Sequence, residues 1–186
     1  MRVVAGTARG RRLKSPPARP RGHPSPVRPS SDLMRGAIFS ALASLDADLS
    51  RVLDIYAGSG ALGIEALSRG AEWCDFVERD PAACAVIREN LRLTGFEGRG
   101  DVHCIPAQRV AARLTGPYTL VLADPPYSDV GAPSVLEQLA SSPLVDAGRT
   151  LLVLEHGARL EPAAALGPLS LLNSRRHGDS AVSIYR

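Results

Sequence analysis

Residues 51–63 read RVLDIYAGSGALG. The segment begins with a short apolar run typical of a buried strand, and Gly58, Gly60 and Gly63 then follow with the spacing G-x-G-x-x-G. A helical apolar pattern continues from residue 61, so we expect strand, glycine loop and helix in immediate succession. Glycines in such a loop let the backbone approach a nucleotide closely. The segment therefore predicts a nucleotide-binding sheet of alternating strands and helices.

The rest of the chain continues this alternation. Short apolar strands separated by helices predict an α/β fold with a mostly parallel sheet and helices on both faces. A final antiparallel hairpin is expected across residues 176–179, between strands at 169–175 and 180–185. The other predicted strands are 51–55, 73–78, 101–105, 118–123 and 149–155, and the predicted helices are 32–45, 61–69, 81–93, 106–114 and 132–141.

Positive charge is concentrated at the start of the chain. Residues 1–35 hold nine basic side chains and one acidic side chain, for a net charge of +8, whereas the remaining 151 residues hold 13 basic and 18 acidic groups, for −5. Glycines among residues 2–13 predict a short hairpin, and a proline-rich linker follows it. Such a basic arm indicates a polyanionic partner, with a solvated tail as the alternative. The candidate nucleic-acid-binding residues are Arg9, Arg11, Arg12, Lys14, Arg28 and Arg35.

Composition excludes several other classes of protein. No stretch of 18 apolar residues occurs, and the basic N-terminus lacks the apolar segment of a secretory signal, so neither a membrane span nor secretion is expected. The three cysteines lack metal-ligand spacing, which predicts reduced thiols and no metal site. We expect a cytoplasmic monomer.

Two acidic residues discriminate between nucleotide ligands. Asp54 lies at the end of the strand before the glycine loop, and Glu78 ends the next predicted strand, twenty residues after Gly58. A carboxylate at the position of Asp54 would repel the pyrophosphate of a dinucleotide, whereas it would attract a cation. S-adenosylmethionine carries an ammonium and a sulfonium and no phosphate, and its ribose hydroxyls can donate to Glu78. This charge pattern favours S-adenosylmethionine over NAD.

A second motif lies at residues 120–129, LVLADPPYSD. Prolines cannot donate to a sheet ladder, so Asp124-Pro125-Pro126-Tyr127 forms a stiff loop after a buried strand. The usual strand order places this loop beside Asp54. The Asp124 carboxylate and the Pro125 carbonyl can accept the two protons of an exocyclic amine, and Tyr127 offers a face for base stacking. We interpret these four residues as a catalytic loop for amine methylation.

The order of these motifs resembles the RsmD family of the class I S-adenosylmethionine-dependent superfamily, which methylates guanine N2 of 16S rRNA at the position named 966. The resemblance rests on RVVAGTARGRRLKSP, VRPSSDLMRGAIFSAL, VLDIYAGSGALGIEALSRGA, ADPPY and RRHGDSAVSIY. It implies a basic arm and linker at residues 1–30 and a Rossmann-like methyltransferase domain at 31–186, acting on the small ribosomal subunit or an assembly intermediate. Gly36 departs from the family pattern, which usually has Glu there. The implied cofactor-binding residues are Asp54, Tyr56, Ala57, Gly58, Gly60, Glu78, Arg79, Pro106 and Ala107.

Two other functions remain open at this point. A DNA adenine-N6 methyltransferase uses a related tetrapeptide, but it needs a target-recognition region for which 186 residues leave no room beyond the arm. A nicotinamide-dependent oxidoreductase conflicts with Asp54, and Lys14 is the single lysine, so no Tyr-x-x-x-Lys pair exists.

Overall fold

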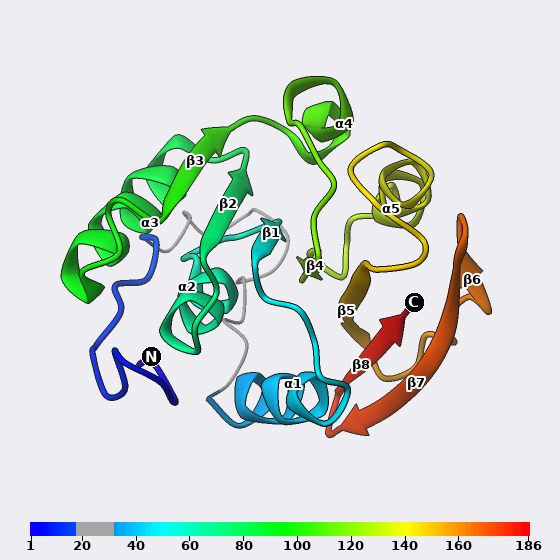
Figure 1. Ribbon diagram of the computed structural model, residues 1–186, viewed down its shortest axis with the longest axis horizontal. Helices are drawn as coiled ribbons and strands as arrows, with labels where there is room; N and C mark the ends of the chain where they lie inside the picture. Colours follow the sequence, from blue (N-terminus) through cyan, green and yellow to red (C-terminus); the bar gives the residue numbers. More distant parts are fainter. Residues whose placement is uncertain (18–31) are drawn as a thin grey trace.

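The computed structural model describes residues 1–17 and 32–186, and its central feature is an eight-stranded sheet in the order β3-β2-β1-β4-β5-β8-β7-β6 (Figure 1). Strands β1 to β5 are parallel, and β8, β7 and β6 are antiparallel to their neighbours. The mostly parallel sheet with a closing hairpin confirms the predicted fold class. The strands are β1 (Arg51–Ile55), β2 (Trp73–Glu78), β3 (Gly100–Cys104), β4 (Leu120–Ala123), β5 (Leu151–Gly157), β6 (Ala165–Leu166), β7 (Leu169–His177) and β8 (Ser180–Tyr185).

Helices cover both faces of the sheet, and each face has its own apolar core. One core contains Ile38, Ile64 and Ile87 from the first three helices, and the other contains Val110 and Leu136 from the last two. Among the helices of the described chain, none combines the length and apolar character needed to cross a membrane. The helices are α1 (Asp32–Ser44), α2 (Ala61–Ser68), α3 (Pro81–Thr94), α4 (Val110–Arg113) and α5 (Ala132–Ala140), with a 3-10 turn η1 (Ala107–Arg109) before α4.

Local chemistry explains where these elements begin and end. Asp80 caps α3 by accepting a hydrogen bond from the backbone N–H of Ala82 at 2.9 Å, and Pro81 occupies the first turn, where no N–H is needed. Gly63 lets α2 lie close against β2, because a Cβ there would come within 2.3 Å of the Phe76 ring. The third glycine of the motif is thus required by helix–sheet packing.

The N-terminal residues form the expected hairpin. Arg2 and Arg12 form an antiparallel bridge, and Val3 donates to the Arg11 carbonyl at 3.0 Å. Val3 and Leu13 are buried in the same core as α1, α2 and α3, so this hairpin is packed against the domain. The expected boundary between residues 30 and 31 lies outside the described residues.

Several details differ from the predicted elements. Strand β5 spans Leu151–Gly157 and not 149–155, and β7 continues to His177, into the turn expected at 176–179. The helix expected at 106–114 is divided into η1 and α4, and the short strand β6 was not anticipated. The strand expected from residue 118 begins at Leu120, while Tyr118 forms an isolated bridge with Val145. The differences at η1, α4, β4 and β6 involve short elements whose extent depends on their neighbours more than on their own periodicity.

Candidate active site at the carboxyl edge of the sheet

The glycine loop follows β1 at the carboxyl edge of the parallel strands. Three of its residues have left-handed backbones: Tyr56 at φ 64°, Gly58 at φ 57° and Gly60 at φ 76°. The N–H of Gly60 donates to the Ala57 carbonyl at 2.7 Å and closes the turn. A side chain at Gly60 would also crowd Ile87, since a Cβ there would lie 3.1 Å from its Cγ2. The loop is therefore tight and leads directly into the first turn of α2.

Asp54 is buried beneath this loop. Its carboxylate accepts a hydrogen bond from the N–H of Gly63 at 2.8 Å, and the residue is 1% exposed. Burial raises the pKa of Asp54 well above its ordinary value, and the nearby carboxylates of Asp124 and Glu78 raise it further, against the opposing Gly63 hydrogen bond. The carboxyl group is thus surrounded by negative charge that a cation would relieve.

Glu78 ties the end of β2 to the glycine loop. One carboxylate oxygen accepts the Gly58 N–H at 2.9 Å, and the other accepts the Asp80 N–H at 2.9 Å. Because carboxylate oxygens can each accept more than one hydrogen bond, Glu78 retains capacity for a ligand hydroxyl. The ribose-binding role predicted for Glu78 requires such a position beside the loop.

Tyr56 contributes a buried polar atom to the same region. Within the described residues its hydroxyl has no hydrogen-bond partner. Burial raises the pKa of Tyr56 to about 12, the carboxylate of Asp129 contributes in the same direction, and Arg79 opposes both. This hydroxyl is therefore a polar group that a bound ligand could satisfy.

The predicted catalytic loop lies next to the glycine loop. Strands β1 and β4 pair in parallel with Ile55 opposite Ala123, so Asp124 follows at the same edge as Tyr56. Pro125 is buried, whereas Tyr127 is 59% exposed. The Tyr127 hydroxyl is hydrogen-bonded to the Ser180 hydroxyl at 2.6 Å. This bond holds the exposed aromatic side chain against the start of β8.

The residues assigned to adenine have mixed environments. Arg79 is exposed directly after Glu78, and Pro106 follows β3 at the carboxyl edge. The Ala107 side chain is buried in the core that contains Val110, so its methyl group packs inside the protein. Any ligand contact at Ala107 would involve its backbone.

Among the basic residues of the N-terminal region that the structure describes, most are exposed, but their contacts differ. Arg9, Arg11, Arg12 and Lys14 are exposed; Arg11 donates to the Leu93 carbonyl at 3.2 Å, and Lys14 forms an ion pair with Glu89 at 3.2 Å. Arg28 lies outside the described residues.

Arg35 corrects the sequence-based assignment. It is 0% exposed, and its guanidinium donates to the Arg2 carbonyl at 2.6 Å and to the Asp32 carboxylate at 2.7 Å. A guanidinium that is buried and joins α1 to the N-terminal hairpin is not available to an RNA phosphate.

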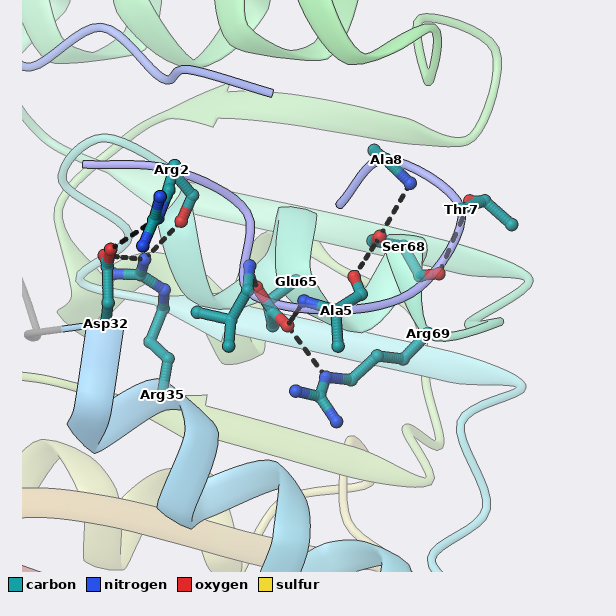
Figure 2. Close-up of polar contacts among 10 residues, drawn as sticks. Arg2, Ala5, Thr7, Ala8, Asp32, Arg35, Glu65, Ser68 and Arg69 are labelled. Atoms are coloured by element: carbon teal, nitrogen blue, oxygen red, sulfur yellow. Dashed lines mark hydrogen bonds and ion pairs between the residues drawn. The ribbon is translucent and has the colours of Figure 1, made fainter. Parts of the chain in front are cut away.

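Figure 2 shows how the N-terminal hairpin is attached to α2. Glu65 is 0% exposed, and its carboxylate accepts hydrogen bonds from the backbone N–H groups of Val4 at 2.7 Å and Ala5 at 2.9 Å. The same carboxylate pairs with Arg69 at 2.8 Å. One turn further along α2, the Ser68 hydroxyl donates to the Ala5 carbonyl at 2.6 Å. These interactions make residues 1–17 part of the folded domain.

Asn90 is a residue that the sequence analysis missed. It is fully buried on α3, and its amide nitrogen donates to the carbonyls of Ser59 at 2.9 Å and Lys14 at 3.0 Å. Its amide oxygen accepts the Lys14 N–H at 2.8 Å. Asn90 thus links the glycine loop to the N-terminal segment, and no motif or spacing in the sequence indicates this link.

The strand order, the glycine loop after β1 and the acidic residue ending β2 define a class I methyltransferase fold. A solved structure described as "Putative methyltransferase yhhF from Escherichia coli" is similar with a TM-score of 0.79 at 29% identity, covering 100% of this chain and 96% of that chain. The family described as "Conserved hypothetical protein 95" matches residues 1–186, and the chain belongs to this family.

Two relatives support the resemblance to RsmD proteins. The Bacillus subtilis protein named "Putative rRNA methyltransferase YlbH" is 32% identical over 190 residues, which cover 100% of this chain and 98% of that protein. The Escherichia coli K12 protein named "Ribosomal RNA small subunit methyltransferase D" is 37% identical over 128 residues. This second match covers 68% of this chain and 60% of that protein.

Proposed function

We propose that this protein transfers a methyl group from S-adenosylmethionine to the exocyclic N2 amine of a guanine in 16S rRNA. By family resemblance the target is the position named 966, on the small ribosomal subunit or an assembly intermediate, in the cytoplasm. One observation carries the proposal: the register of β1 with β4 brings the Asp124 loop beside the glycine loop. The names of the two relatives support an rRNA substrate.

The acidic cluster supports S-adenosylmethionine as the methyl donor. Burial raises the pKa of Asp54, and the carboxylates of Glu78 and Asp124 lie close enough to raise it further. A ligand carrying an ammonium and a sulfonium relieves this repulsion, whereas a pyrophosphate would add to it. When bound, the cofactor supplies an activated methyl group, and the chain must align an acceptor with it. Glu78 holds the ribose hydroxyls, and Asp54 provides the negative field near the methionine end.

The loop Asp124–Tyr127 performs the alignment. The Asp124 carboxylate and the Pro125 carbonyl accept the two amine protons, which directs the nitrogen lone pair away from them. The negative charge of Asp124 also stabilises the positive charge that develops on the nitrogen in the transition state. Tyr127 stacks on the base, an interaction of about 1–3 kcal/mol in comparable complexes. Because Tyr127 is largely exposed, a base that leaves the RNA stack can reach its ring.

The decisive experiment uses small subunits from a strain that lacks this methylation. They are incubated with the protein and labelled S-adenosylmethionine, and the methylated nucleosides in 16S rRNA are mapped by mass. We expect a single N2-methylguanosine. A methyl group on adenine N6 in RNA or DNA would contradict the guanine assignment, and NAD binding without S-adenosylmethionine binding would contradict the reaction class.

A substitution in the loop separates chemistry from binding. Asp124→Ala should lose nearly all turnover while S-adenosylmethionine affinity stays within a few-fold, because Asp124 acts mainly in the transition state. Calorimetry measures the affinity and single-turnover labelling measures the rate. Near wild-type turnover would show that Asp124 does not orient the amine.

A further inference from the structure

We propose that the end of the β7–β8 hairpin is a second RNA-binding surface, which holds the phosphates of nucleotides flanking the target base. This β7–β8 tip consists of Arg175, Arg176 and His177 together with Arg159, which follows β5. The inference rests on the proposed RNA substrate and adds a surface that lies outside the basic N-terminal region.

The tip is at the same edge of the sheet as the catalytic loop. Because β8 is antiparallel to β5, its first residue, Ser180, pairs with Gly157 at the end of β5 and with His177 at the end of β7. Ala158 also donates to the Asp179 carbonyl at 2.9 Å, which brings the residues after β5 against the hairpin turn. The hydrogen bond between Tyr127 and Ser180, 2.6 Å long, joins the start of β8, beside His177 of the tip, to the side chain proposed to stack on the base.

Three exposed arginines give the tip its positive charge. Arg159, Arg175 and Arg176 are all exposed, and none has an ion-pair partner in the part of the chain that the structure describes. Asp179 and Glu161 lie in the same two segments and lower the net charge, but within the described residues they do not pair with these guanidinium groups. Arginine presents several donors in a fixed geometry that matches a phosphate.

The two neighbouring arginines face opposite sides of the hairpin. Arg175 is opposite Val182 and lines a hollow beside Ala37 and Ala41 of α1, whereas Arg176 is opposite Ala181. Successive residues of a strand point to opposite faces, so the two guanidinium groups flank the tip. This arrangement suits an RNA backbone that passes over the edge of the sheet, with one phosphate held on each side.

The turn of the N-terminal hairpin, which contains Arg9, lies elsewhere. Thr7 donates to the Ser68 carbonyl at the end of α2, and Arg11 donates to the Leu93 carbonyl near the end of α3. Helix α2 runs from the glycine loop at the carboxyl edge to Ser68, a length of about 12 Å at 1.5 Å per residue. The turn that contains Arg9 is therefore at the far end of α2 from the glycine loop, so the two basic surfaces would bind different parts of the RNA.

The test is a double variant, Arg175→Ala with Arg176→Ala, in the full chain. Its binding to unmethylated small subunits is measured against salt concentration, alongside wild type. We expect the affinity to fall about tenfold or more and the log–log salt slope to flatten by about 0.7–0.9 for each phosphate that the variant no longer neutralises. S-adenosylmethionine affinity, measured by calorimetry, should not change.

A matched control removes the same charge elsewhere. Arg113→Ala with Arg149→Ala changes two exposed arginines, one on α4 and one paired with Asp48, and should leave the affinity and the salt slope near wild type. If the alanine variant melts at a lower temperature, Arg175→Gln with Arg176→Gln preserves polar side chains and provides the same comparison.

The outcomes separate this inference from the proposed function. The inference is overturned, and the function stands, if the wild-type protein binds and methylates small-subunit RNA while the Arg175 and Arg176 variants keep the wild-type affinity and salt slope. An equal loss in the Arg113 and Arg149 control would also overturn it, because the effect would then reflect net charge alone. If the wild-type protein neither binds nor methylates small-subunit RNA, the proposed function fails and the inference fails with it.

Discussion

Replacing Glu65 with Gln tests whether the N-terminal hairpin is an integral part of the fold. The carboxylate of Glu65 is inaccessible to solvent and accepts hydrogen bonds from Val4, Ala5 and Arg69 (Figure 2). Gln has almost the same size, but it replaces one acceptor oxygen with an amide nitrogen, which can only donate. In the less disruptive orientation the Gln amide faces Val4, and the Ala5 and Arg69 bonds are kept without the negative charge.

The expected loss follows from these hydrogen bonds. One buried N–H without a partner costs about 1–3 kcal/mol, and the hydrogen bond to Arg69 loses its charge assistance, which adds about 1 kcal/mol. The free energy of unfolding should therefore fall by about 2–4 kcal/mol. Burial of the Val3 and Leu13 side chains contributes about 1.5–3 kcal/mol each, so the hairpin should loosen before it detaches.

Two measurements check this prediction. Urea denaturation gives the change in unfolding free energy, and hydrogen exchange should show faster exchange of the Val4 and Ala5 amides than of amides in β1 and β4. Glu72→Gln is the matched control, because Glu72 is exposed just after α2, and its effect should stay within about 0.5 kcal/mol. A Glu65→Gln protein as stable as this control, with unchanged exchange, would refute the assigned role of Glu65.

Three further predictions concern Asp54, Asn90 and Gly36. Burial raises the folded-state pKa of Asp54, so its contribution to stability is present below the unfolded pKa of about 4 and is lost as pH rises. Urea unfolding without ligand should therefore show Asp54→Asn gaining stability relative to wild type between pH 4 and 8. A stability difference that stays constant over this range would contradict the prediction. Asn90→Asp should weaken S-adenosylmethionine binding about tenfold in calorimetry, because an acid repels the Ser59 and Lys14 carbonyls; unchanged affinity would show that the link does not support the glycine loop. Gly36→Ala should raise the unfolding free energy by about 0.5–1 kcal/mol, since helical Gly is unfavourable and the nearest atom to a new Cβ is 3.9 Å away, and a destabilised protein would contradict that packing.

Much of the fold could be predicted because its signals are local. The apolar residues before Gly58 indicate a buried strand without reference to distant residues. Gly58 and Gly60 adopt backbone angles that other residues rarely adopt. The two prolines after Asp124 similarly end β4 through their own geometry. The less accurate predictions fall where an element is short, as in the turn η1 and strand β6, whose hydrogen bonds depend on segments elsewhere in the chain.

The sequence by itself determined the order of strands and helices, the glycine loop and the loop at Asp124–Tyr127, because periodicity and backbone preference act over a few residues. Only the tertiary structure decided which charged groups face solvent. Arg35 and Arg9 belong to the same basic region, yet Arg35 is buried because a carbonyl 33 residues away and the Asp32 carboxylate converge on its guanidinium. Arg175 and Arg176 lie far from that region in sequence, and the pairing of β7 with β8 places them near Ser180, which contacts Tyr127. The number of charged residues in a segment does not determine where their side chains point, because tertiary packing decides that.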